Sequence, residues 1–205
     1  MEQRTDDRLT RLCAVLTWLG IVALMVGNVV GSILVPGHDW IADTISDLAA
    51  GRWEIVQDVA LYGYAAGIMA LALAAAHIHR GEHGWLIGTF SLSVLAAIVV
   101  VIGARNEYGD RDSDGVVIHL YLVIALGLLF SVTMVAMAEG LERLKPGLKV
   151  ASYVCAGLWA VGSIIFFLMP DGWDGLWERG IGVITMVWLG LAAWAVRGSE
   201  GLPEK

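Results

Sequence analysis

The chain contains an uncharged run of 21 residues, GWLIGTFSLSVLAAIVVVIGA, which extends from Gly84 to Ala104. A helix of about 20 apolar residues crosses the roughly 30 Å hydrocarbon core of a bilayer. Because lipid offers no partners to backbone amides, only helices or closed barrels span it. This run lacks the alternating pattern of a barrel strand, so it predicts a membrane-spanning helix.

Five further runs without Asp, Glu, Lys or Arg have similar length, and together the runs predict six spans. The uncharged runs are Leu12–Gly37, Val59–Ala76, Gly115–Ala138, Val150–Pro170 and Gly180–Val196. We predict helices over residues 11–35, 56–79, 85–104, 116–138, 148–169 and 178–197. These use most of the 205 residues, of which only 16% are charged, against roughly 25% in a soluble domain. The prediction is one all-α integral-membrane domain over residues 1–205, a polytopic six-helix bundle.

The first connection between spans has a helical pattern of its own. Pro36 and Gly37 end the first helix. After them Ile41, Ile45 and Leu48 recur at helical spacing, and Asp39 is a residue type that caps helix starts. The pattern predicts a short interfacial helix over residues 38–48.

Lys and Arg in short loops set the orientation of a membrane protein, because they collect on the cytoplasmic side. Nine of the thirteen lie at the termini and in the second and fourth connections, namely Arg4, Arg8, Arg11, Arg80, Arg143, Lys145, Lys149, Arg197 and Lys205. We therefore expect a multi-pass protein of the cell inner (plasma) membrane, with both termini cytoplasmic.

Acidic residues collect on the opposite side. Twelve of the twenty Asp and Glu lie in the first, third and fifth connections, which hold only four Lys and Arg. These outer connections therefore carry a net charge of about −8. A functional site is predicted on this outer side.

Within the outer connections, several charges are placed unfavourably. Asp43 and Asp47 are four residues apart, a spacing at which like charges on a helix repel by roughly 0.2–0.5 kcal/mol. Arg179 follows a predicted helix start, where the helix dipole disfavours a cation. An acidic partner, Asp43 or Asp47, is expected for it. Our candidate ligand-binding residues are Asp43, Ser46, Asp47, Arg105, His119, Glu178 and Arg179. They predict a salt-bridge network over the bundle, a ligand site, or both.

The third connection suggests one metal. Asp110, Asp112 and Asp114 alternate before Gly115, as oxygen ligands do in a Ca²⁺ loop. The twelfth position, where such a loop has a bidentate Glu, is Tyr121. Two interpretations stay open: a divalent-cation site, or a solvated acidic loop. No other cofactor is predicted.

Three short motifs resemble a known family. They are Ile45-Ser46-Asp47-Leu48, His119 at the start of the fourth span, and Asp174-Gly175-Leu176-Trp177-Glu178-Arg179 before the sixth. The set resembles the bacterial domain-of-unknown-function family 998, and is distantly similar to the damage-regulated autophagy modulators. The resemblance implies a six-helix membrane protein and implies no particular activity.

Three functions remain open from the residues. The first is binding or transport of a lipid headgroup, a cation or a small solute at the outer face. The second is an enzyme acting on an outer-leaflet lipid with Ser46, Asp47, His38 and His119, although no G-x-S-x-G or H-E-x-x-H sequence occurs. The third is a structural or assembly subunit. The expected partners are membrane lipids and a small outer ligand, with no nucleic acid. Small-residue pairs such as Gly27/Gly31 and Gly63/Gly67 permit a homo-oligomer.

Overall fold

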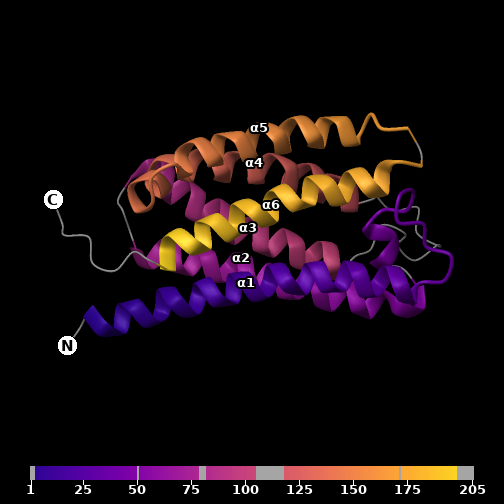
Figure 1. The fold of residues 1–205 in the computed structure, drawn as a ribbon, viewed down its shortest axis with the longest axis horizontal. Helices are drawn as coiled ribbons and strands as arrows, with labels where there is room; N and C mark the ends of the chain where they lie inside the picture. Colours follow the sequence, from indigo (N-terminus) through magenta and orange to yellow (C-terminus); the bar gives the residue numbers. More distant parts are fainter. Residues whose placement is uncertain (1–2, 50, 79–81, 105–117, 171, 198–205) are drawn as a thin grey trace.

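The protein is a bundle of six long helices that lie side by side along its longest axis (Figure 1). The computed structural model describes residues 3–49, 51–78, 82–104, 118–170 and 172–197. The helices are α1 (Gln3–Leu34), α2 (Glu54–Ile78), α3 (His83–Ala104), α4 (Ile118–Leu144), α5 (Leu148–Phe166) and α6 (Asp174–Arg197). All six are long and apolar enough to cross a membrane, and the described residues include no strand. The predicted fold class is confirmed.

Apart from α1, which begins at Gln3 instead of residue 11, two helices extend by four or more residues beyond their predicted bounds. α4 continues to Leu144 instead of ending at residue 138, because its last turns are amphipathic: Leu141 is buried and Glu139 is exposed. α6 begins at Asp174 instead of residue 178, and Asp174 places a negative charge in the first turn, where the helix dipole favours it. Both extensions carry charged residues to the ends of the bundle.

The helices run alternately up and down, so the start of α1 and the end of α6 lie at one end of the molecule, which we call the end with the termini (Figure 1). Consecutive helices pack against each other, and α6 packs against both α5 and α1, which closes the bundle. The contact of α1 with α2 is close: a side chain added at Gly20 would meet the carbonyl oxygen of Gly63 at 2.7 Å. The starts of α2, α4 and α6 lie at the opposite end.

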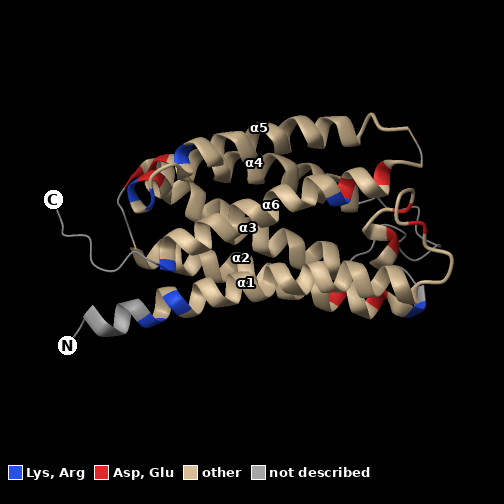
Figure 2. Cartoon of the chain, viewed as in Figure 1, with Lys and Arg blue, Asp and Glu red and all other residues tan. Residues whose placement is uncertain are grey.

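Charge is sorted between the two ends of the bundle (Figure 2). The end with the termini holds most of the described Lys and Arg, and two of these pair with acids: Arg143 with Glu82, and Lys149 with Glu139 at 2.5 Å. At the other end, which we call the outer end, the described acids are Asp39, Asp43, Asp47, Glu54, Asp58, Asp174 and Glu178. Only Arg52 and Arg179 are basic among the described residues there.

The segment between α1 and α2 is not the single helix that its spacing predicts over residues 38–48. It forms turns, followed by two short 3₁₀ helices, η1 (Ser46–Ala49) and η2 (Gly51–Trp53). The physical reason is local side-chain capping. The Oδ1 atom of Asp39 accepts hydrogen bonds from the amides of Ile41 at 2.9 Å and Ala42 at 3.3 Å. Such bonds give the backbone an alternative to the helical ladder.

Candidate functional site

Arg179, in the second turn of α6, is a buried cation that binds the loop after α1. Only 8% of its surface is exposed. Its Nη1 donates to the carbonyl oxygens of Asp43 at 2.7 Å, Gly175 at 3.0 Å and Trp40 at 3.2 Å. Its guanidinium also lies over the Trp40 ring, 4.5 Å from the centroid, which is a cation–π contact. One side chain therefore holds the loop against the start of α6.

The second guanidinium nitrogen fixes the state of His38. Nη2 of Arg179 lies 2.9 Å from Nε2 of His38. Because arginine has only donors, Nε2 must accept, so the imidazole is neutral and its hydrogen is on Nδ1. That nitrogen faces Oδ2 of Asp43 at 3.4 Å. The pKa of His38 lies below its ordinary value, because burial and then the charge of Arg179 outweigh the opposing charges of Asp43, Asp47 and Asp39.

The predicted acidic partner of Arg179 is wrong in its detail. Arg179 donates to carbonyl oxygens and an imidazole, and no carboxylate of the described residues is among its hydrogen-bond or ion-pair partners. The carboxylate of Asp43 is connected to Arg179 indirectly, because His38 contacts both side chains. The reason is that the loop approaches α6 with its backbone: a side chain at Gly175 would collide with the Asp43 carbonyl.

The predicted repulsion between Asp43 and Asp47 on one helical face does not arise, because that helix is absent. Each carboxylate instead caps its own turn. Oδ2 of Asp43 accepts from the amide of Asp39 at 2.7 Å. Oδ2 of Asp47 accepts from the amide of Thr44 at 2.6 Å and from its hydroxyl at 2.9 Å. Both acids therefore shape the loop.

Two further bonds join the loop to α6. Oε2 of Glu178 accepts from the amide of Ile45 at 2.6 Å, and the amide of Leu176 donates to the carbonyl of Ile41 at 3.0 Å. Together with the contacts of Arg179 they form what we call the outer clamp, made of His38, Trp40, Ile41, Asp43, Ile45, Gly175, Leu176, Glu178 and Arg179. The clamp brings together residues more than 120 positions apart in the sequence.

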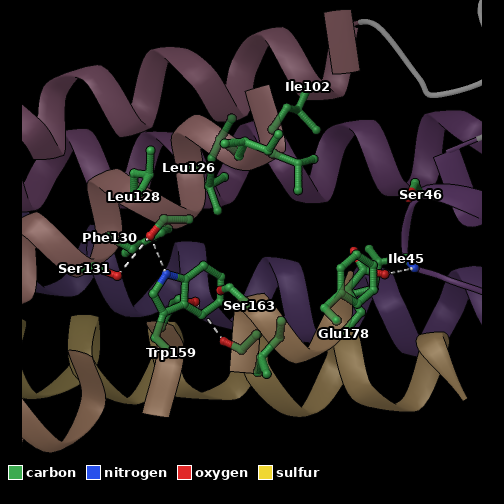
Figure 3. Close-up of a pocket in the computed structure, with 18 of the residues that line it drawn as sticks. Ile45, Ser46, Ile102, Leu126, Leu128, Phe130, Ser131, Trp159, Ser163 and Glu178 are labelled. Carbon is green, nitrogen blue, oxygen red and sulfur yellow. Dashed lines mark hydrogen bonds between the residues drawn. The ribbon is translucent and has the colours of Figure 1, made fainter. Parts of the chain in front are cut away.

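Beneath the clamp, a cavity of about 380 Å³ extends into the bundle. Its walls come from all six helices, α1 contributing Leu24, together with the loop, and most lining side chains are apolar. Ser46, His119 and Glu178 line the outer part, which we call the mouth. Figure 3 shows Ile45, Ser46 and Glu178 at one side of the cavity, and Phe130, Ser131 and Trp159 at the other.

The interior of the cavity contains a few hydrogen-bonding groups. The indole Nε1 of Trp159 donates to the carbonyl of Gly127 at 2.9 Å, and the Ser131 hydroxyl donates to the same oxygen at 3.1 Å. The hydroxyls of Tyr64 and Thr185, which also line the cavity, lie 2.9 Å apart. No charged residue is among the lining residues below the mouth.

The structure divides the candidate residues into two groups. Arg179 and Asp43 belong to the clamp, and Ser46 and His119 line the mouth, while Glu178 belongs to both. Asp47 caps the loop next to Ser46. The candidates Arg105, Asp110, Asp112 and Asp114 lie outside the described residues. Within the described residues, no group of three or more His, Cys, Asp and Glu could hold a metal ion.

Sequence reasoning left out His38 and Trp40 as partners of Arg179, and the whole cavity. His38 and Trp40 lie just after Pro36 and Gly37, which end the first helix. An imidazole and an aromatic ring at a helix end can contact a cation, and this could have identified both residues as candidate partners of Arg179. The cavity has no such signal, because its lining residues are the ordinary apolar residues of six spans.

Comparisons with known proteins give the family and no closer relative. No curated protein matches the chain, and no solved structure matches it. One family model matches residues 14–195, which include four of the six spans in full, most of the first and last spans, and the outer clamp. The chain therefore belongs to the family described as "Protein of unknown function (DUF998)", the family that residues 45–48, 119 and 174–179 resemble.

Proposed function

We propose that this protein binds an amphiphilic lipid from the outer side of the membrane. The apolar part of the lipid would occupy the cavity, and its polar end would lie at Ser46, His119 and Glu178. The observation that carries the proposal is the cavity itself, which joins a polar mouth to an apolar interior of about 380 Å³. Ligand pockets of about 300–1,000 Å³ with mostly apolar walls and a few polar groups are typical of small-molecule sites.

The chemistry of the lining favours a lipid over an ion. A cation in the interior would lack a carboxylate partner, because the lining residues below the mouth are uncharged, and burying an unpaired charge is costly. At the mouth, a carboxylate and an imidazole can accept hydrogen bonds from a headgroup hydroxyl or amine. The ligand we propose therefore has a polar, uncharged or cationic end and an apolar body.

A substitution that fills the cavity tests the proposal. Gly182 of α6 lines the cavity, and a Cβ added there meets nothing within 4 Å, so Gly182→Leu places a side chain in the open space. Gly157 of α5 is a matched control, since it is also open and does not line the cavity. We expect native mass spectrometry to show bound lipid on the wild-type protein and on Gly157→Leu, and much less on Gly182→Leu. Equal lipid occupancy in all three would refute the proposal.

An enzymatic role is the second candidate, and one observation bears on it. The Ser46 hydroxyl lies at the mouth, 3.1 Å from the Thr44 hydroxyl, which in turn binds Asp47. A serine nucleophile needs a general base within hydrogen-bond reach. The partner of Ser46 here is a hydroxyl, which is a poor base, so binding is favoured over hydrolysis.

The charge distribution supports an orientation for the proposed site. We propose that both termini are cytoplasmic and that the mouth of the cavity opens to the outer side of a cell membrane. The support is the collection of Lys and Arg at the end of the bundle that holds the termini, and of acids at the other (Figure 2).

A further inference from the structure

Several hydroxyl groups in the described parts of the spans are satisfied by their own helix. Thr17, Thr89, Ser93 and Thr133 each donate to the carbonyl four residues earlier, at 2.6 to 3.2 Å. This back-bonding is the common way to satisfy a hydroxyl in an apolar helix. An unsatisfied polar group in the hydrocarbon region is costly, because lipid provides no partner.

Ser163 of α5 does not make this bond. Its Oγ is buried and has no hydrogen-bond partner, although the helix would offer the carbonyl of residue 159. Ser163 lines the cavity, and its Oγ lies across from α4, where it would be 3.9 Å from a Cβ added at Gly127. The hydroxyl therefore faces another helix at the cavity wall instead of bonding to its own.

The neighbouring groups do not complete the coordination of Ser163. The Gly127 carbonyl, on the facing helix, already accepts from Trp159 and Ser131. A carbonyl oxygen has two lone pairs, so this acceptor is fully used. The O–H of Ser163 is consequently a donor without an acceptor inside an otherwise apolar space.

The cavity wall also presents an acceptor. The Thr185 hydroxyl donates to the Gly182 carbonyl at 2.8 Å, which uses its only hydrogen. In the 2.9 Å bond between Thr185 and Tyr64 the donor must then be Tyr64. The Tyr64 oxygen keeps its lone pairs, and Tyr64 also lines the cavity. The interior thus offers a donor without an acceptor, Ser163, and an acceptor whose lone pairs remain, Tyr64.

We propose that the lipid bound in this cavity carries an oxygen, as a hydroxyl or carbonyl, within its apolar part, and that Ser163 donates a hydrogen bond to it. This inference rests on the proposed function and names the class of ligand. The facing residue, Gly127, is eight residues beyond His119, which corresponds to roughly 12 Å along a helix. The oxygen therefore lies well below the polar end of the lipid.

Competition between two lipids tests the inference. The probes are a monoacylglycerol and the same molecule with a hydroxyl on its chain, which differ in mass by one oxygen and share an uncharged headgroup. We expect native mass spectrometry of an equimolar mixture to show the hydroxylated form enriched on the wild-type protein by about twofold to tenfold, the value of one net hydrogen bond. Ser163→Ala should bring the ratio to one.

A matched control separates this effect from a general loss of packing. Ser93 of α3 donates to its own helix and does not line the cavity, so Ser93→Ala should keep the wild-type ratio. Moving the hydroxyl along the chain should give a preference with a maximum at one depth. An enrichment that persists in Ser163→Ala, or that is the same at every chain position, would overturn the inference while leaving lipid binding intact. Binding of neither lipid would instead refute the proposed function.

Discussion

At the scale of single residues, Arg179 explains how an acidic outer end can enclose a buried cation. A guanidinium presents several donors in a fixed plane, and here they reach three carbonyls and one imidazole. Three of these neutral acceptors are backbone carbonyls, those of Trp40, Asp43 and Gly175. Arg179 is therefore a structural part of the outer clamp, and the polar groups that line the mouth of the cavity are its neighbour Glu178, Ser46 and His119.

Replacement of Arg179 should destabilise the protein. Arg179→Gln leaves the carbonyls of Trp40 and Asp43 without their donor, and a hydrogen bond to a charged group contributes roughly 1.5–3 kcal/mol. We expect a lower midpoint of thermal unfolding in detergent, whereas Arg52→Gln, an exposed outer arginine, should change it little. An unchanged midpoint for Arg179→Gln would exclude the clamp.

Coupling energies between pairs of residues distinguish the outer clamp from the salt bridge that the sequence predicts. A double-mutant cycle of Arg179→Gln with His38→Ala should be strongly non-additive, because the two side chains are in contact at 2.9 Å. The cycle of Arg179→Gln with Asp47→Asn should be closer to additive, since Asp47 binds Thr44 and acts on Arg179 only through its field. The reverse order of the two coupling energies would restore the predicted Arg179–Asp47 contact.

The neutral state of His38 predicts a pH dependence. In the folded protein its pKa is lowered from 6.5, so the unfolded chain binds a proton that the folded chain does not. Stability is therefore fully present above about pH 6.5 and decreases as the pH falls toward the lower folded pKa. We expect thermal unfolding scans to show this decrease in wild type and a weaker one in His38→Gln, whose amide oxygen can still accept from Arg179. His83→Gln, in the first turn of α3, serves as the control.

At the scale of elements, the sequence predicts the spans well and the outer connection poorly. A membrane-spanning helix can be predicted from its apolar composition alone, so the uncharged runs located all six spans. Residues 38–48 follow other rules, because Asp39, Asp43 and Asp47 bond to nearby amides. The apolar periodicity of that segment therefore predicted a helix where side-chain caps produce turns and 3₁₀ helices.

The contact between α6 and the loop depends on a glycine. Gly175 is buried, and a Cβ there would collide with the backbone carbonyl of Asp43. Gly175→Ala should separate the two elements, at a cost of roughly 1–3 kcal/mol for an overpacked site. Gly180→Ala is the control within the same helix, since its Cβ meets nothing. Equal unfolding midpoints for both variants would contradict the close approach.

At the scale of the whole molecule, charge sorting and the even number of spans determine the architecture, whereas the cavity follows only from three-dimensional packing. The sequence could identify Ser46, His119 and Glu178 as polar residues of the outer end. It could not show that they line one cavity with Tyr64 and Trp159, because that depends on how α4 packs relative to α2 and α6.

The proposed orientation has its own test. Lys and Arg collect at the end of the bundle with the termini. A reporter that functions only in the cytoplasm should therefore be active when it is joined after Lys205. The same reporter placed in the connection after α3 should show the opposite activity. Activity outside the cell for the fusion after Lys205 would reverse the orientation and place the cavity mouth on the cytoplasmic side.

The central claim is that the cavity beneath the outer clamp holds a lipid. Photocrosslinking with a monoacylglycerol that carries a diazirine on its chain tests it most directly, because the label reports the residues next to the bound chain. The account predicts labelled peptides from α4 and α5 at lining residues such as Leu126, Phe130 and Trp159, with the yield reduced in Gly182→Leu and unchanged in Gly157→Leu. Labelling confined to exposed residues such as Phe90 and Leu158, with the same yield in both variants, would contradict the claim.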